Sequence, residues 1–522
     1  MTASKHDEAS VGRALGILAV LTVAVLPVPG AARTATPASV TAAVQSIETY
    51  IDEHMRQDMV PGLSIAVVFA DEVVYLKGFG VREAGKPEAV DADTVFQLAS
   101  FSKPISSSVV AAIVAGGTLS WDSRIADIDP SFRLHDAYPS QEVTLRDLFA
   151  HRSGLPGDAG NNLEALGYDR ATILHRLRLV PAASSFRAGY SYSNFGLTAG
   201  AVAAARTTGK AWEDLAEELV YAPLGMTSTS SRHADFLARP NRAALHVRFA
   251  GRWQALSQRM PDAQAPAGGV SSSARDLAQW LRLQLGSGRY DGRQVVAADA
   301  LVETHLPVIR RGADPFTGAS SFYALGWNVG YRPEGAELGH AGAFSNGART
   351  VVRLVPSEQI GLVVLTNAFP TGAPDAVADV FLDLVFDGAP SRDWLTEWNR
   401  LYESLFGPLA AAQKKTFGTP PPAPTPALPD DAYTGTYRSS YFGDAVVVAA
   451  DGAMQLRLGP AGAKVFRLAH YDRDVFYYYP YDEMPDVPFG ITFEVGPDGR
   501  AVRAVLEDLD DLDLGVFARV PD

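Results

Sequence analysis

Predicted strands lie at both ends of residues 38–388, and helical segments fill the middle. Residues 63–69 and 73–79 are apolar runs joined by a short polar turn, which predicts a hairpin. Residues 350–355 and 360–365 predict two more strands, again joined by a short turn. The most economical fold is one antiparallel sheet whose strands come from distant parts of the chain.

Helices are expected on this sheet and between its strand pairs. Apolar residues recur at helical spacing over residues 38–58, and a further helix is predicted around 377–386. Helical patterns dominate the middle of the chain, for example the segment opened by Ser273 with Asp276 three residues later. We therefore predict an α/β (α+β) fold, in which an antiparallel sheet is flanked by helices and carries an inserted α-rich subdomain.

A second unit is expected after this fold. A helix over about 392–406 leads into the proline-rich residues 419–426, so residues 389–428 are interpreted as a helix and a semi-rigid linker. Short strand-like runs separated by Gly- and Asp-rich turns then follow, at 433–437, 445–449, 454–458, 475–479, 491–495 and 502–506. This density of strands predicts a C-terminal antiparallel β-barrel or sandwich over residues 429–522.

Charge and the N-terminal segment indicate where the chain acts. The net charge of −14 argues against nucleic acid or an anionic membrane surface as a partner, because binding phosphate requires clustered cations. Residues 1–32 have the charged, apolar and small-residue layout of a signal peptide, with cleavage expected after Ala32. We expect an exported protein, periplasmic or secreted, with no further membrane segment. The chain contains no cysteine, so its fold depends on its core alone.

Ser100 and Lys103 form the only Ser-x-x-Lys sequence in the chain. Residues three apart share one face of a helix, so the lysine amine can reach the serine hydroxyl and take its proton. Proline is tolerated in a helix mainly in its first turn, so Pro104 places Ser100 close to the helix start. There the backbone N–H of Ser100 can bind an oxyanion. The helix dipole and partial burial disfavour the charged form of Lys103, as a general base requires.

Two later segments carry further candidate site residues. Tyr192 and Asn194 lie about 90 residues after the serine: the phenol can relay a proton, and the amide can bind a substrate carbonyl and the lysine. His340 and Gly342 precede the strand at residue 350 and are expected to form a wall of the site, where glycine allows a close approach to the backbone.

Three motifs follow one another along the chain: Ser100-x-x-Lys103, Tyr192-x-Asn194 and His340-x-Gly342. With these motifs in this order, the chain resembles the serine beta-lactamase and penicillin-binding-protein superfamily. The resemblance is strongest to its class C beta-lactamase-like esterases and D-aminopeptidases. The resemblance covers residues 38–388 and implies a beta-lactamase/transpeptidase-like fold. Residues 429–522 resemble the lipocalin-like C-terminal domain of some members. Shorter stretches also match the superfamily, at Val60-Pro-Gly62, His151-Arg-Ser-Gly-Leu-Pro156, Ala222-Pro-Leu-Gly-Met-Thr227, Ala267-Gly-Gly-Val270 and Val364-Leu-Thr-Asn367.

The resemblance also implies a role for each candidate. Ser100 would attack a carbonyl to form an acyl-enzyme, and Lys103 and Tyr192 would act as one coupled acid–base unit. Asn194 would hold the substrate amide, and the N–H groups of Ser100 and Ala343 would bind the oxyanion.

One departure from the superfamily pattern bears on the substrate. Many members carry Lys-Thr-Gly or Lys-Ser-Gly where this chain has His340-Ala-Gly342. Because histidine is only partly cationic near neutral pH, tight capture of a substrate carboxylate is not expected from this strand. We therefore expect a serine hydrolase for small peptide, amide or ester substrates, including peptides that contain D-residues. A carboxylesterase or lactonase remains open, as does a non-catalytic peptide or peptidoglycan sensor.

Other catalytic classes lack their signatures. The chain has neither the Gly-x-Ser-x-Gly elbow of an α/β-hydrolase nor a His-Glu-x-x-His metal motif. Ser345 lies in a near match to the elbow and is interpreted as a turn residue. We expect no metal and no cofactor.

Overall fold

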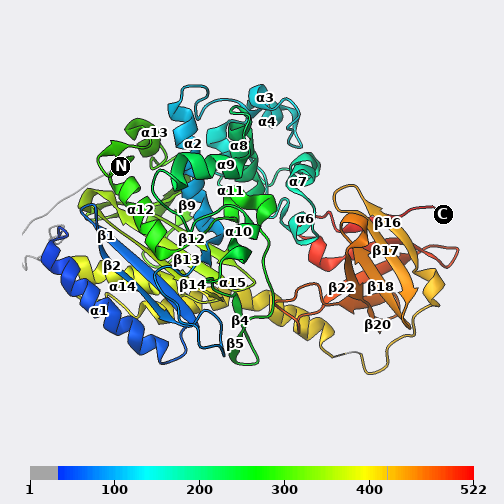
Figure 1. Cartoon of the computed structure of the whole chain (residues 1–522). Coiled ribbons are helices and arrows are strands. Elements are labelled where there is room, and N and C mark those ends of the chain that lie inside the picture. The colour runs from blue at the N-terminus through cyan, green and yellow to red at the C-terminus, as the bar shows by residue number, and fades with distance from the viewer. Residues whose placement is uncertain (1–32, 420, 522) are drawn as a thin grey trace, which may run out of the picture.

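The predicted antiparallel sheet is present and has eight strands (Figure 1). The computed structural model describes residues 33–419 and 421–521, so the predicted signal peptide lies outside the described residues. Every neighbouring pair in the sheet is antiparallel, in the order β2-β1-β14-β13-β12-β11-β10-β9. The strands are β1 (Gly62–Phe69), β2 (Glu72–Gly80), β9 (Ile309–Ala313), β10 (Ser320–Tyr323), β11 (Asn328–Arg332), β12 (Gly335–Phe344), β13 (Ala348–Val355) and β14 (Ile360–Thr366).

The two predicted strand pairs lie next to each other in this sheet, with β2 at its edge. β1 pairs with β14 from Leu63, opposite Thr366, to Phe69, opposite Ile360. Leu63, Ile65 and Val67 of β1 join one hydrophobic core, and the alternate residues Ala66 and Val68 join another. Both faces of the central strands are therefore covered, which explains why their sequences are continuously apolar rather than alternating.

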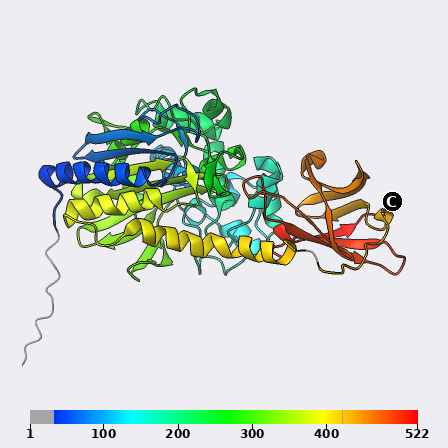
Figure 2. The ribbon, with the colours of Figure 1, turned by 90° about the horizontal axis from the view of Figure 1, so that it is seen from below.

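Helices from both ends of the first unit cover one face of the sheet. α1 (Pro37–Met55) and α14 (Ala373–Phe386) pack side by side there, and α15 (Trp394–Phe417) continues the layer (Figure 2). The opposite face carries α2 (Ser102–Ala115) and α12 (Ala274–Leu285), together with the inserted helical region. Ser273 caps α12 by accepting a hydrogen bond from the Asp276 backbone N–H, as its sequence predicts.

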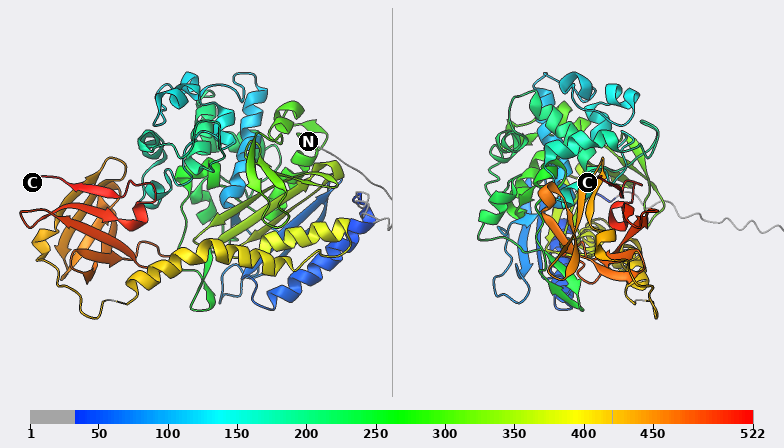
Figure 3. Two further views of the ribbon diagram at one scale, coloured as in Figure 1. Left: turned by 180° about the vertical axis from the view of Figure 1, so that it is seen from behind. Right: turned by 90° about the vertical axis from the view of Figure 1, so that its right-hand side faces the viewer.

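The helix before the proline-rich linker is longer than predicted. The sequence predicts a helix over about 392–406 that leads into the proline-rich residues 419–426. In the structure α15 continues through Pro408 to Phe417 and extends toward the C-terminal unit (Figure 3). Its first half is held on α14, where the Trp398 indole donates to Asp379 at 2.7 Å. This contact involves residues distant in sequence and is invisible to local propensity.

A buried ion pair connects the sheet to these helices. The Arg349 guanidinium of β13 donates two hydrogen bonds to the Asp375 carboxylate of α14, at 2.8 and 2.9 Å. The same guanidinium contacts the Tyr402 hydroxyl of α15. Arg349 and Asp375 are only 7% and 1% exposed, so each charge depends on the other for its solvation.

The C-terminal unit is a nearly closed antiparallel barrel of nine strands, running β19-β18-β17-β16-β24-β23-β22-β21-β20. The two end strands of this order are consecutive in sequence, so the sheet curls until they approach one another. Six strands match the predicted runs, and the short strands β19, β20 and β24 were missed. The strands are β16 (Gly435–Ser439), β17 (Gly443–Ala450), β18 (Ala453–Leu458), β19 (Lys464–Arg467), β20 (Ala469–Asp472), β21 (Val475–Tyr478), β22 (Phe489–Val495), β23 (Ala501–Leu506) and β24 (Val516–Arg519).

The barrel packs against the inserted helical region. The Tyr168 hydroxyl donates to the Phe442 carbonyl oxygen at 2.7 Å, and the Arg176 guanidinium donates to the Tyr441 carbonyl oxygen at 2.7 Å. Arg176 also lies over the Tyr168 ring, 4.3 Å from its centroid. Across residues 33–419 and 421–521, no helix combines the length and apolar character needed to cross a bilayer.

Removing one partner of the buried ion pair should destabilise the fold. We expect Arg349→Met to lower the free energy of unfolding by about 3–5 kcal/mol, because the buried Asp375 carboxylate loses two charge-assisted hydrogen bonds and keeps only Arg353, 3.9 Å away, as a counter-charge. Urea denaturation followed by circular dichroism measures this change. The double variant Arg349→Met/Asp375→Leu should be more stable than Arg349→Met alone. A double variant that loses the sum of both single losses would contradict the interpretation.

Candidate active site

The serine of the Ser-x-x-Lys sequence lies in the turn that opens α2. Ser100 occupies a short 3₁₀ turn (Ala99–Phe101), and α2 follows from Ser102, with Pro104 in its first turn. Ala99 has a φ of 49°, an unfavourable backbone conformation for a residue with a side chain. Ser100 is half-buried, so its hydroxyl can meet a substrate while the helix behind it is fully packed.

The amine of Lys103 is buried, and no carboxylate of residues 33–419 or 421–521 forms an ion pair with it. Its Nζ lies 2.9 Å from Ser100 Oγ, 2.7 Å from Asn194 Oδ1 and 2.9 Å from the Ala267 carbonyl oxygen. The side chain is 0% exposed, and burial holds the pKa of the amine well below its usual value. A neutral amine has two N–H donors, which the two oxygens of Asn194 and Ala267 accept. Its lone pair is then left for the serine hydroxyl.

The phenol of Tyr192 lies beside this pair. Lys103 Nζ is 4.5 Å from the centroid of the Tyr192 ring. Burial raises the pKa of Tyr192, and a hydrogen bond with Ser100 opposes the rise only in part. The phenol is therefore protonated in the resting site and able to donate. Serine, lysine and tyrosine meet at one place although about 90 residues separate the two sequence segments.

Asn194 is the first residue of α8 (Asn194–Arg206), whose start is capped by the Ser193 side chain. Its Oδ1 accepts a hydrogen bond from Lys103 Nζ. This bond fixes the orientation of the amide, so that Nδ2 points away from the lysine. Nδ2 donates to Asn161 Oδ1 at 3.2 Å. The second hydrogen of the Nδ2 amide remains available for a substrate carbonyl. This is the role that the family resemblance implies for Asn194.

The strand β12 presents an open edge to the serine turn. β11 pairs only with Gly335–Gly339, so residues 340–344 of β12 have no strand on that side. Gly342 instead contacts the serine turn: an added Cβ would lie 1.9 Å from the Leu98 carbonyl oxygen and 3.0 Å from the Phe101 nitrogen. We expected this glycine to admit a ligand, and the structure shows that it admits the backbone carrying Ser100. The half-buried Ala343 follows on the same open edge.

His340 forms an internal wall and is uncharged. Its Nδ1 lies 2.8 Å from the Ala341 carbonyl oxygen, which can only accept, so Nδ1 carries the hydrogen. Nε2 then accepts from the Tyr323 hydroxyl at 2.9 Å. Burial is the main cause that holds the pKa of His340 well below its usual value. From the sequence, His340 is expected to be partly cationic near neutral pH. In the structure its surroundings favour the neutral ring.

An aromatic cluster around Tyr192 contains residues that the sequence analysis did not place in the site. The His151 ring centroid is 4.5 Å from that of Tyr192 and 4.8 Å from that of Tyr323. His151 is 1% exposed and accepts at Nδ1 from the Ser193 backbone N–H at 3.1 Å. Tyr190 lies 5.3 Å from Tyr323 on the same cluster. The motif containing His151 was noticed in the sequence but not assigned, and nothing local marked Tyr323.

The barrel reaches the site through α6 (Asn161–Ala165). The backbone N–H of Gly160 donates to the Tyr441 hydroxyl of the barrel at 2.7 Å, immediately before Asn161. A second contact lies after the open edge of β12, where the Ser345 hydroxyl donates to Glu483 of the barrel at 2.7 Å. Ser345 is thus a turn residue, as predicted from its sequence. The C-terminal unit supports two borders of the site.

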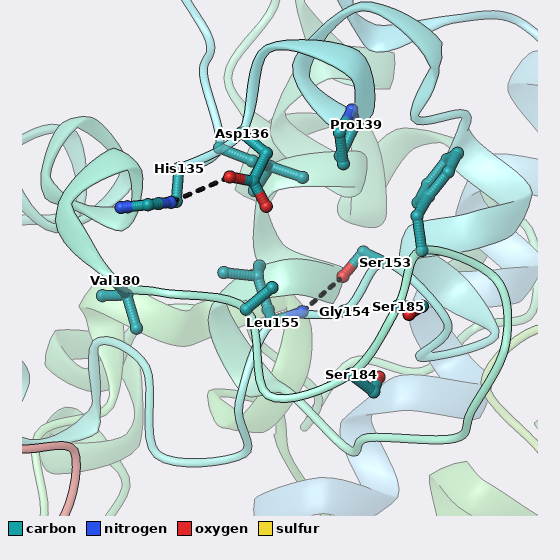
Figure 4. Close-up of a pocket in the computed structure, with 12 residues that line it drawn as sticks. His135, Asp136, Pro139, Ser153, Gly154, Leu155, Val180, Ser184 and Ser185 are labelled. Carbon is teal, nitrogen blue, oxygen red and sulfur yellow. Dashed lines mark hydrogen bonds and ion pairs between the residues drawn. The ribbon is translucent and has the colours of Figure 1, made fainter.

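A separate pocket of about 250 Å³ lies in the helical region (Figure 4). Its lining includes His135 and Asp136, which hydrogen-bond at 3.0 Å, together with Ser153 and Ser184. Ser100, Lys103 and Tyr192 are not among its lining residues. Among the residues the structure describes, no group of three or more His, Asp or Glu side chains is arranged to hold a metal ion.

Comparison with known proteins gives matches over both units. A model of the beta-lactamase family matches residues 47–385, and a model described as a domain of unknown function (DUF3471) matches residues 419–516. Unguisins hydrolase ungD' of Aspergillus campestris is 26% identical over 405 residues, covering 72% of each chain. Penicillin-binding protein 4 of Amycolatopsis lactamdurans is 27% identical over 389 residues, covering 70% of this chain and 90% of that protein.

A solved structure extends the similarity to the fold of the whole chain. The octameric penicillin-binding protein homologue from Pyrococcus abyssi superposes with a TM-score of 0.57 at 19% identity. The match covers 89% of this chain and 98% of that one. At this identity the similarity shows a shared fold.

The close contact at Gly342 yields a direct test of the site geometry. We expect Gly342→Ala to lower kcat/KM by about 100-fold, because a methyl group at this position must displace the turn that carries Ser100. Gly330→Ala is the matched control, since an added Cβ there meets nothing within 4 Å. Steady-state kinetics on a nitrophenyl ester measures both. Equal activity of the two variants would contradict the proposed packing.

Proposed function

Because the chain belongs to the beta-lactamase family and is a serine hydrolase, we propose that Ser100 is its nucleophile and that it cleaves small peptides or amides through an acyl-enzyme. The observation that carries the proposal is the environment of Lys103. A buried amine with two oxygen acceptors and one hydroxyl neighbour is arranged to accept the proton of that hydroxyl.

In the proposed acylation step, Ser100 Oγ forms a bond to the substrate carbonyl carbon as its proton passes to Lys103 Nζ. The negative charge on the carbonyl oxygen is stabilised by the backbone N–H groups of Ser100 and Ala343. Tyr192 then donates its proton to the leaving nitrogen or oxygen as that bond breaks. The proton on Lys103 returns to Tyr192, which restores both groups to their neutral resting forms.

Deacylation follows the same route with water in place of the leaving group. Water attacks the acyl carbon and gives a proton to the Lys103–Tyr192 unit, which returns it to Ser100 Oγ as the acid product leaves. Asn194 is proposed to bind the substrate carbonyl through its free amide hydrogen. Asn161 and His151 act as positioning residues, because they contact Asn194 and Tyr192 respectively.

The proposed substrate is a small peptide or amide, with D-residue-containing peptides among the candidates. Two relatives, an unguisins hydrolase and a penicillin-binding protein, support this class. A neutral His340 in place of the usual lysine argues against a site specialised for penicillin hydrolysis. The charged, apolar and small-residue layout of residues 1–32 supports the further proposal that the protein is exported.

Covalent labelling tests the proposed nucleophile. We expect a fluorophosphonate probe to add one label to the wild-type protein at Ser100 and none to Ser100→Ala, detected by intact-mass and peptide mass spectrometry. The thermal unfolding of Ser100→Ala should match that of the wild type. Lys103→Met and Tyr192→Phe should each slow labelling and turnover on the order of 10³-fold, and their double variant should be little worse because the two act as one unit.

The same experiment separates the competing functions. Unlabelled wild-type protein would identify a binding protein without catalysis. A panel of D- and L-aminoacyl amides, dipeptides, nitrophenyl esters and nitrocefin distinguishes the enzymes. Hydrolysis of esters alone would replace the peptidase proposal by a carboxylesterase or lactonase.

The pH dependence of activity should reflect the two neutral groups. Lys103 must be unprotonated to act as base, and its pKa is lowered, so kcat/KM should rise with pH well below the value of 10.5 for free lysine. Tyr192 must be protonated, and its pKa is raised, so activity should persist into alkaline solution. If kcat/KM instead rose with pH only near the pKa of free lysine, Lys103 would be charged in the resting enzyme, and the proposed base would be wrong.

A further inference from the structure

The barrel holds the short helix that carries Asn161. α6 has only five residues, and its capping residue Gly160 has no side chain that could accept a hydrogen bond from the first turn. A helix this short depends on tertiary contacts for its position. The buried backbone N–H of Gly160 has its acceptor in the barrel, where the Tyr441 hydroxyl lies 2.7 Å away. Asn162 Nδ2 donates to a second barrel atom, the Asp508 carbonyl oxygen, at 3.3 Å.

The residue between these two contacts faces the active site. Asn161 Oδ1 accepts a hydrogen bond from Asn194 Nδ2 at 3.2 Å. Asn161 Nδ2 lies 3.4 Å from the Gly157 carbonyl oxygen, which fixes the direction of its own amide. Asn194 Oδ1 in turn accepts from Lys103 Nζ at 2.7 Å. One backbone N–H and two side-chain amides therefore connect the barrel to the proposed base.

Close packing connects the same two segments. Gly160 has a φ of 90°, and an added Cβ would lie 2.4 Å from Cδ2 of Phe195, the residue that follows Asn194. Glycine permits both this backbone conformation and the close approach to the ring. Because the contact is tight, a shift of Gly160 is expected to disturb the start of α8, where Asn194 lies.

We propose that Tyr441, a residue of the barrel, is a positioning residue of the active site. Its hydroxyl keeps the first turn of α6 in the place where Asn161 can hold the amide of Asn194. With that amide held, its Oδ1 faces Lys103. Without the hydroxyl, the buried Gly160 N–H loses its acceptor, and the turn has to move to find another. The barrel thus contributes to catalysis as well as to stability. This inference rests on the proposed roles of Lys103 and Asn194 in acyl transfer.

Removal of one hydroxyl from the full-length protein tests the proposal. Tyr441→Phe should lower kcat/KM for nitrophenyl acetate by about 10-fold, because the amide beside the base is no longer held in place. Fluorophosphonate labelling of Ser100 should slow to the same degree. Tyr168→Phe is the matched control, since it also removes a phenol hydroxyl from a 2.7 Å hydrogen bond between the helical region and the barrel. Tyr168 lies after α6 and donates to Phe442, so Tyr168→Phe should retain wild-type activity.

The pH dependence separates positioning from a loss of folded protein. A hydrogen bond from Lys103 to Asn194 Oδ1 is stronger for the charged amine than for the neutral one. Weakening this bond in Tyr441→Phe should therefore lower the pKa of Lys103 further and move the rise of kcat/KM to lower pH. A variant that is only partly folded would lose activity at every pH, with the rise in its original place.

A double-variant cycle shows whether Tyr441 acts through Asn161. In a protein that already carries Asn161→Ala, adding Tyr441→Phe should cause little further loss, because the connection is already broken. If Tyr441→Phe does not fold, Asn162→Ala removes the second barrel contact of the same turn and should give the same changes to a smaller degree.

Three outcomes would overturn the proposal. They are wild-type activity of Tyr441→Phe, equal losses in Tyr441→Phe and Tyr168→Phe, and losses from Tyr441→Phe and Asn161→Ala that multiply independently. Failure of the acyl-enzyme proposal itself looks different, because the wild-type protein is then not labelled at Ser100 and does not hydrolyse nitrophenyl acetate.

Discussion

The burial of one amine controls the arrangement of this site. Lys103 is enclosed with two oxygen acceptors and the serine hydroxyl, and its surroundings provide no carboxylate to stabilise an ammonium. A charged amine there would pay a large desolvation penalty, so the fold favours the form that can take a proton. Each acceptor comes from a different segment: Asn194 from the start of α8, and Ala267 from the short helix α11 (Ala265–Gly268). The basicity of the lysine is thus a property of the assembled fold.

The sheet and the helical region meet at this point, and each contributes a border. The open edge of β12 lies against the turn of Ser100, and the absence of a side chain at Gly342 makes that contact possible. On the other side, Asn194 opens α8 of the inserted region, and Tyr192 lies in the loop just before it. The barrel supports this second border through Tyr441, whose hydroxyl fixes the backbone just before Asn161. A domain joined by a proline-rich linker is therefore part of the structure that holds the catalytic groups.

The sheet side of the site also determines the charge of the residue at position 340. The histidine at position 340 is neutral because the sheet buries it and Tyr323 occupies its second nitrogen. The substitution of the usual lysine by His340 therefore removes a cation from this strand, and substrate preference has to be inferred from the folded surroundings of the position as well as from the motif.

The sequence by itself determined the central strands, the helices α1, α12 and α14, most of the barrel and the three segments that meet in the site. These follow from hydrophobic periodicity, capping residues and short motifs, which are local properties. It did not determine the length of α15, the strands β9 to β11, or the positions of His151, Tyr190 and Tyr323 in the cluster around Tyr192. Those depend on contacts between residues far apart in the chain. Only the tertiary structure decided that Lys103 is buried, that His340 is neutral and that Gly342 accommodates the serine turn, because burial and close approach arise only when distant segments pack together.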